Sequence, residues 1–305
     1  MTNTLFLRNQ LEYIQSQIVK QDFPERMIAN GTLLPISREI PEGADTYSYK
    51  ILTAFGSAKI LATGAEDLPS IGAGVEKRTG YVRTIANQFE ITYDELQFAE
   101  YAGVNVNAEM GIIAYEVMMQ EIDALGYLGD SNHNLLGMLN HPNVPSTTAL
   151  NDGTSGATTW ASKTPDKIYR DLRSFVSSVR SSTNMVEAPD TMLLPVAQFD
   201  LIAQEPFPSG TSSTILSFFL EQQRKYPGGI TQVLPVPYID NRGPGGVDLA
   251  ILLSRREAKI KFHIPRDFTT LETQASGMKY CTPCNMRCGG VQLIKPLSMA
   301  YLTGI

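Results

Sequence analysis

The first pattern along the chain is a stretch of apolar residues at helical spacing, followed by prolines. Leu7, Leu11 and Ile14 lie on one face of a helix, which predicts an amphipathic helix over residues 4–20. Residues 23–45 then contain three prolines and two glycines. Because proline lacks a backbone donor, this density favours an extended arm over a helix or a central strand.

Two β-leaning runs follow the arm. Residues 46–61 and 75–93 are rich in Tyr, Ile, Val, Thr and Phe, and a glycine-rich stretch separates them. This pattern predicts a long β-hairpin. An isolated two-stranded ribbon is marginally stable in water, and its edges are open to pairing. The hairpin must therefore fold back onto its own domain or be covered by a neighbouring subunit.

A helical pattern begins where the second β-run ends. Thr92 and Glu95 have the spacing of a capping box, which marks a helix start. After a break at Gly103, a second helix is predicted over 106–125, with an apolar stripe through Met110, Ile113 and Val117 and a C-cap at Gly126. Residues 93–125 contain seven acidic residues and neither lysine nor arginine. This run is typical of a solvated face and argues against phosphate binding by the helix.

The second half of the chain alternates between helical and strand patterns. Residues 145–166 are polar and read as a linker across a surface. Helix and strand signals then alternate over 166–269, which predicts a compact α/β domain. The tail reads as two strands broken at Gly289-Gly290.

Composition narrows the classes of function. The chain of 305 residues is 43% hydrophobic and 18% charged, enough to bury a sizeable core. Its net charge of −6 argues against a protein whose whole surface binds nucleic acid, although a local basic patch remains compatible. No apolar run is long enough to span a bilayer, and the N-terminus lacks a signal-peptide layout. We therefore expect no membrane partner and synthesis in the cytoplasm.

Three cysteines and one histidine are the strongest candidates for a metal site. Cys281, Cys284 and Cys288 are spaced C-x2-C-x3-C, and His263 lies upstream as a fourth possible ligand. Zinc sites usually have two close ligand pairs, whereas here three ligands are crowded and the fourth is remote. The run also lacks a strong iron–sulfur spacing. Small buried thiols are the favoured interpretation, so we predict no metal and no cofactor.

A second candidate lies in the stretch 126–144, which contains His133, His141 and Asp130. Metal binding or acid–base chemistry is compatible with these residues. A polar turn whose side chains satisfy freed backbone groups explains them equally well and is favoured. Phosphate-loop, zinc-protease and nucleophile-elbow motifs are absent. We therefore predict no catalytic residues and a protein that is not an enzyme.

The order of these parts resembles the major capsid proteins of tailed bacteriophages, which share the Hong-Kong-97-type fold with encapsulin nanocompartments. Four segments carry the resemblance at sequence level: "LLPISREIPEGADTYSYKILTAFGSAKIL" (33–61), "EDLPSIGAGVEKRTGYVRTIANQFEITYDELQFAEYAGVNVNA" (66–108), "GYLGDSNHNLLGMLNHPNV" (126–144) and "GGVQLIKPLSMAYLTGI" (289–305). Together they extend from about residue 33 to the end of the chain. The cysteine trio and the polar linker are departures from the pattern.

The resemblance implies an α+β fold with four parts. They are an N-terminal arm (1–40), an extended β-hairpin loop (41–92), a peripheral domain with a long spine helix (93–165 and 270–305) and an α/β axial domain (166–269). In this fold the extended loop lies across an adjacent subunit, which buries its open faces. Residues 126–144 become the turn that leaves the spine helix, anchored by Leu135, Leu136, Met138 and Leu139.

The implied function is assembly. Many copies form hexamers and pentamers and close into an icosahedral head shell around double-stranded DNA, which is held by non-specific contact. Expected partners are other copies of the chain, with scaffolding, portal and decoration proteins as further candidates. The location is the virion, assembled in the host bacterial cytoplasm. The alternatives are an encapsulin-like compartment, a tail or decoration protein, and a metal-dependent enzyme.

Overall fold

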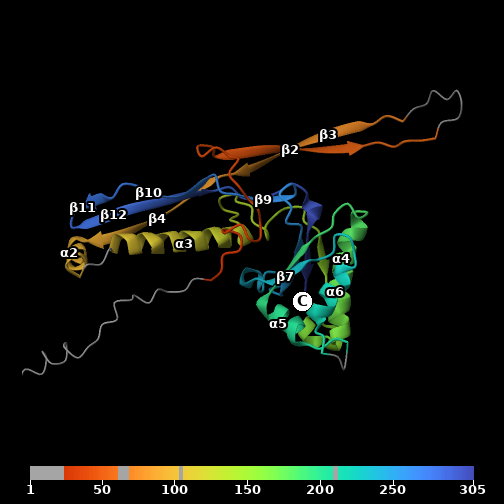
Figure 1. Cartoon of the computed structure of the whole chain (residues 1–305). Coiled ribbons are helices and arrows are strands. Elements are labelled where there is room, and N and C mark those ends of the chain that lie inside the picture. Colours follow the sequence, from red (N-terminus) through yellow and green to blue (C-terminus); the bar gives the residue numbers. More distant parts are fainter. Residues whose placement is uncertain (1–23, 61–68, 103–105, 209–211) are drawn as a thin grey trace, which may run out of the picture.

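The computed structural model describes residues 24–60, 69–102, 106–208 and 212–305. The helix predicted over 4–20 and the break at Gly103 lie outside these residues. Figure 1 shows an elongated part built on one long helix, a compact part at its end, and a two-stranded ribbon. The fold is mixed α+β, as the sequence predicts.

The helices are α2 (Tyr93–Ala102), α3 (Val106–Leu128), α4 (Pro165–Ser182), α5 (Val196–Gln204) and α6 (Ile215–Arg224). The strands are β1 (Ile36–Ser37), β2 (Thr46–Phe55), β3 (Gly72–Tyr81), β4 (Arg83–Thr92), β5 (Ser146–Thr148), β6 (Thr191–Leu194), β7 (Gln232–Pro235), β8 (Leu249–Leu253), β9 (Ile260–His263), β10 (Arg266–Thr270), β11 (Gln274–Ser276), β12 (Lys279–Cys288), β13 (Gly290–Leu293) and β14 (Met299–Thr303). Short 3-10 turns complete the chain.

The elongated part packs α3 against an antiparallel sheet. In this sheet β12 pairs with β4, β10 and β11. Alternate residues of β4 and β12, such as Phe89, Ile91 and Met286, are buried in one hydrophobic cluster with Met118 and Ile122 of the helix. The apolar residues at every second position of the strands and those on one face of the helix thus pack into one core.

The start of α2 confirms the predicted capping box. The Thr92 backbone N–H donates to the Glu95 carboxylate over 2.9 Å, and the Glu95 N–H donates to the Thr92 hydroxyl over 3.3 Å. Two backbone donors that lack helical partners are satisfied in this way. The hydrogen bonds from Thr92 also hold the pKa of the Glu95 carboxyl below its usual range.

The run 75–93, predicted as one strand of the hairpin, is two strands with different partners. β3 pairs with β2 over their full lengths, whereas β4 pairs with β12. Val82, between them, is buried, and its N–H donates to the Asp45 carbonyl. β4 therefore lies in the antiparallel sheet beside α3, whereas the sequence predicts 41–92 as one extended hairpin loop. The one glycine of the run, Gly80, lies inside β3 opposite Tyr47, so it does not mark the change of partner at Val82.

The compact part is an α/β domain around a five-stranded sheet with the strand order β5-β14-β8-β6-β7. Strands β6 and β8 are buried along their whole lengths, and Phe175 of α4 and Phe219 of α6 pack over the sheet. Helices and strands alternate over 166–269 as predicted, but β9 pairs with β1 and β13, and β10 pairs with β12, so these two strands lie outside this sheet. The tail contains three strands instead of two, and the last of them, β14, lies in the five-stranded sheet, between β5 and β8.

The end of α3 differs from the prediction. The helix continues through Gly126 to Leu128, and Gly129, with φ +65°, terminates it. Gly126 serves instead as a contact point for the arm, because a Cβ there would lie 2.7 Å from the Ile28 side chain. The buried Asp123 carboxylate accepts the N–H groups of Ile28 and Ala29 over 2.8 and 3.0 Å. The arm is therefore fixed to the last turns of the helix.

Gly126→Ala is expected to destabilise the protein by about 1–3 kcal/mol, because the new methyl group collides with Ile28 in a packed core. Gly111→Ala is the matched control in the same helix, since a Cβ there meets nothing within 4 Å. That substitution should stabilise the protein by about 0.5–1 kcal/mol through helix propensity. Urea unfolding of both variants tests the difference, and equal stabilities would contradict the contact.

Candidate assembly surfaces

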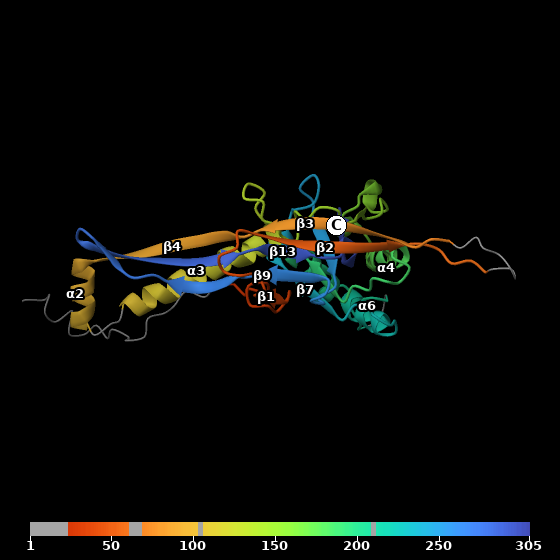
Figure 2. The same cartoon turned by 90° about the horizontal axis from the view of Figure 1, so that it is seen from above.

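The inner half of the hairpin is anchored to its own chain. The Tyr47 ring lies 4.8 Å from the His263 ring, and its hydroxyl donates to the Gly289 carbonyl over 3.3 Å. The Tyr49 hydroxyl donates to the Leu293 carbonyl over 3.5 Å. Burial raises the pKa of Tyr47. Seen from above, β2 and β3 cross over β9 and β13 at this point (Figure 2).

The outer half of the hairpin exposes apolar side chains. Leu52 is 68% exposed, Phe55 64% and Val75 61%, and Ile60 and Ile71 beyond the strands are even more exposed. Within the described residues, β2 and β3 pair only with each other. A two-stranded ribbon that projects from the body, as in Figure 1, gains little stability by itself. Apolar groups gathered on such a ribbon mark a surface that another molecule covers.

A second apolar surface lies at the opposite end, on α2 and α3. Phe98 is 72% exposed and Tyr101 96%, while Ile113 and Val117 of α3 are each 47% exposed. The apolar stripe predicted through Ile113 and Val117 therefore does not face the core. The buried positions are one residue further on, at Ala114 and Met118, and of the predicted stripe Met110 packs against the core. The helix has two apolar faces, and the sheet covers only one of them.

The histidines of the stretch 126–144 act as parts of a turn. The His133 Nδ1 lies 2.5 Å from an Asp130 carboxylate oxygen, and the other oxygen accepts the Asn132 N–H. His141 is buried, and its Nδ1 lies 3.1 Å from the Pro142 carbonyl oxygen. Burial lowers the pKa of this imidazole. The expected anchors Leu135 and Met138 are buried, whereas Leu136 and Leu139 are half-buried.

The candidate metal ligands do not converge. Cys284 and Cys288 lie on the buried face of β12, and Cys281 lies on the opposite face. The His263 Nε2 is 2.6 Å from the Gln292 side-chain oxygen. Burial raises the pKa of the Cys288 thiol to about 11, so it stays protonated at neutral pH. Among the described residues, no three His, Cys, Asp or Glu side chains gather closely enough to hold a metal.

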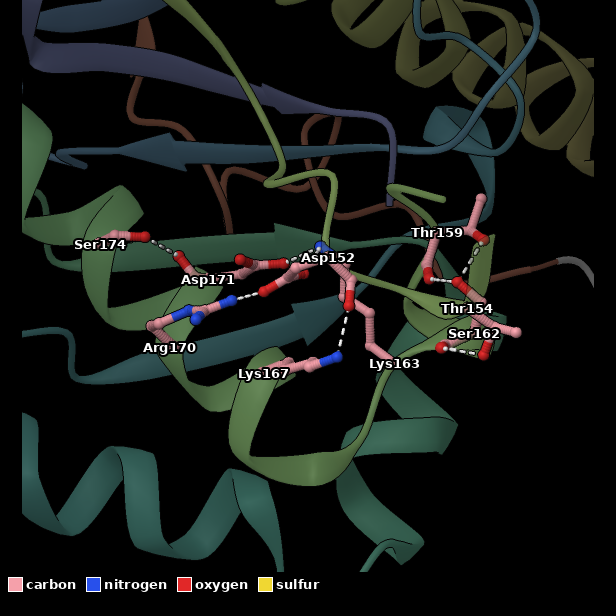
Figure 3. Close-up of polar contacts among 9 residues, drawn as sticks. All are labelled: Asp152, Thr154, Thr159, Ser162, Lys163, Lys167, Arg170, Asp171 and Ser174. Atoms are coloured by element: carbon pink, nitrogen blue, oxygen red, sulfur yellow. Dashed lines mark hydrogen bonds and ion pairs between the residues drawn. The ribbon is translucent and has the colours of Figure 1, made fainter. Parts of the chain in front are cut away.

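The segment predicted as a surface linker, 145–166, is instead packed into the compact α/β part of the structure. β5 adds an edge strand beside β14, and Trp160 is fully buried. The Lys163 ammonium, which is completely enclosed, lies 2.5 Å from the Asp171 carboxylate of α4 and 3.3 Å from Asp152 (Figure 3). Arg170 and Lys167 also bind Asp152. Polar composition concealed this packing, and the single tryptophan was the signal that could have revealed it.

The arm, the two-stranded ribbon, the long helix under an antiparallel sheet and the axial α/β domain define a shell-forming protein of the Hong-Kong-97 type. The family model described as "Major capsid protein" matches residues 56–305, and the chain belongs to this family. It therefore builds a capsid shell from copies of itself, is part of the virion, and belongs to a structural family. No curated protein matches the chain in sequence.

Solved structures share the fold at low sequence identity. The capsid of the Myoviridae phage XM1 has a TM-score of 0.78 and 20% identity, with 97% of this chain and 98% of that chain covered. The capsid of a native GTA particle has a TM-score of 0.67 and 8% identity, covering 96% and 95%. A virus-like particle from Pyrococcus furiosus has a TM-score of 0.58 and 13% identity, covering 89% and 90%.

No helix among the described residues is both long and apolar enough to cross a membrane.

Proposed function

We propose that copies of this chain form hexamers and pentamers that close into an icosahedral head shell around double-stranded phage DNA, assembled in the host bacterial cytoplasm. The observation that carries this proposal is the apolar outer half of the hairpin, which the described part of its own chain leaves exposed. A neighbouring copy that receives the hairpin would bury Leu52, Phe55 and Val75.

The energetics favour collective assembly. Fully burying a large apolar side chain contributes roughly 1.5–3 kcal/mol, whereas association costs on the order of 4–15 kcal/mol. One hairpin contact is therefore weak by itself. Each copy both donates a hairpin and receives one, and repeated contacts of this kind raise the effective concentration of the next contact. The two contacting surfaces differ, so the contacts are heterologous. Such contacts form a finite shell when the rotation that relates one copy to the next returns to the first copy.

We further propose new boundaries for two of the four parts. The extended loop would end at Tyr81 instead of Thr92, because β4 pairs along its whole length with β12. The axial domain would gain β5 and β14, because both strands belong to its sheet. With these boundaries, the paired strands β4 and β12 belong to the peripheral domain, where β4 packs against α3.

Packaged DNA would be held by confinement, consistent with a net charge of −6. Scaffolding, portal and decoration proteins remain proposed partners. The match to the family model described as a major capsid protein favours a DNA-filled head over an encapsulin-like compartment.

Electron microscopy of the purified protein, combined with nuclease treatment of particles from infected cells, tests this function. We expect closed icosahedral shells, and DNA inside mature heads that resists nuclease until the shell is disrupted. A monodisperse monomer at high concentration would contradict shell formation. Shells whose cargo is protein, with no protected DNA, would contradict the phage head and support a compartment.

A further inference from the structure

A pocket of about 710 Å³ lies between α4 and α6, the helices at the end of the molecule away from α3 (Figure 1). Arg173 and Arg180 line it, together with hydroxyl and amide groups such as those of Ser177 and Gln222, and the aromatic ring of Tyr226. None of the residues that line the pocket is acidic. Its wall is therefore rich in hydrogen-bond donors and carries positive charge.

Arg180 is the unusual group in this wall. The residue is buried, at 9% exposure, and its guanidinium stacks over the Tyr226 ring with its central carbon 5.3 Å from the ring centroid. One terminal nitrogen donates to the Gln223 side-chain oxygen over 3.0 Å and to the Gly228 carbonyl over 3.4 Å. Its Nε is buried without a partner, and no described acidic residue forms an ion pair with it. Burying a charge without a counterion is costly, so the site favours an anion.

The surroundings reinforce this charge. Arg173 is exposed and has no ion pair in the described part of the chain. A neighbouring hollow of about 440 Å³ continues along α4 past Arg170 and shares Arg173 with the pocket. The protein as a whole is acidic, but α4, α6 and the residue after α6 carry six cationic and three acidic side chains: Lys167, Arg170, Arg173, Arg180, Arg224 and Lys225 against Asp166, Asp171 and Glu221.

We propose that this pocket binds a phosphate group, with the guanidinium groups of Arg173 and Arg180 supplying charge and the serine and amide groups supplying further donors. Phosphate oxygens accept hydrogen bonds only, which matches a wall of donors, and guanidinium groups bind them in a fixed fork geometry. The volume lies in the range of ordinary small-molecule sites and can admit a nucleoside monophosphate. The phosphate can belong to a free nucleotide or to a nucleic-acid backbone. The whole pocket lies within one chain, so this inference does not depend on shell assembly.

Arg173→Gln is the first test, because this exposed side chain has no described ion pair to lose and the variant should fold normally. Equilibrium dialysis of the full chain with labelled inorganic phosphate, and titration calorimetry with deoxyadenosine monophosphate, measure binding. We expect Arg173→Gln to weaken binding by roughly tenfold, as for loss of one charge-assisted hydrogen bond. Arg256→Gln, at an exposed arginine outside the pocket, is the matched control and should bind as the parent does.

Arg180→Lys provides a second, independent variant. Lysine keeps the positive charge but lacks the forked donors of the guanidinium group, so we expect phosphate binding to weaken. The melting temperature of the variant, measured in parallel, reports any loss of folding. A short DNA oligonucleotide distinguishes the two sources of phosphate. If the oligonucleotide binds tightly and in a salt-sensitive manner, and Arg173→Gln weakens this binding, then the ligand is the nucleic-acid backbone. If free phosphate and the oligonucleotide bind with equal affinity, then the ligand is a free phosphate compound. Absence of binding at millimolar phosphate, or equal binding by Arg173→Gln and Arg256→Gln, would overturn the proposal.

Discussion

Replacing Leu52 and Phe55 together with aspartate is expected to abolish closed shells while the subunit remains folded. Both side chains are more than half exposed in the single chain, so their loss removes little packing. In the assembled shell each would be buried by a neighbour. The double substitution then removes roughly 1.5–3 kcal/mol of apolar burial per side chain and forces two carboxylates into the contact. Because every subunit carries the change, the penalty recurs at each contact of the shell.

Sedimentation velocity and electron microscopy measure the outcome. The assembled fraction should fall at least about tenfold, since every 1.4 kcal/mol changes an equilibrium constant by that factor. Thr46→Asp with Ser48→Asp is the matched control: both residues are exposed on the same strand, near the anchored base, and the added charge is equal. Shells of normal yield from the Leu52 and Phe55 variant would show that the hairpin does not mediate assembly.

The parts of this fold that the sequence predicts correctly are those encoded over a few neighbouring residues. The capping box at Thr92 and Glu95 and the amphipathic pattern of α4 depend on residues three or four positions apart. The two-stranded ribbon of β2 and β3 was also predictable, because its residues favour strands, and its role as an assembly surface stays a prediction. Local chemistry was sufficient for each of these conclusions.

The features that the sequence does not reveal depend on residues far apart in the chain. Gly126 looked like a helix terminus, and only its contact with Ile28 explains why glycine is required there. β4 could not be assigned to β12 from its own residues, because their pairing joins residues 83–92 to 279–288. The pocket at Arg180 was missed for the same reason: its walls come from two helices separated by about forty residues, and a single arginine on an amphipathic helix carries no local signal.

Replacing Lys163 with methionine is expected to destabilise the axial domain strongly. Lys163 is completely enclosed, and its partner Asp171 is 1% exposed at the side chain. Removing the ammonium leaves Asp171 as a buried carboxylate without its cation, which costs about 3–5 kcal/mol in comparable buried pairs. A loss of this size should lower the melting temperature by roughly 6 °C or more for a chain of this length. Differential scanning calorimetry of the variant measures it.

Two comparisons make the Lys163 result interpretable. Lys225→Met breaks an exposed pair with Glu221, 3.8 Å apart on α6, and should change stability by less than about 1 kcal/mol. The double variant Lys163→Met with Asp171→Leu removes both charges and should recover most of the loss, because two apolar groups of similar volume need no counterion. If Lys163→Met is as stable as Lys225→Met, then the ion pair does not hold residues 149–164 against α4. Recovery in the double variant would attribute the loss to the unpaired carboxylate of Asp171 and would show that residues 149–164 pack against α4 as long as neither charge is buried alone.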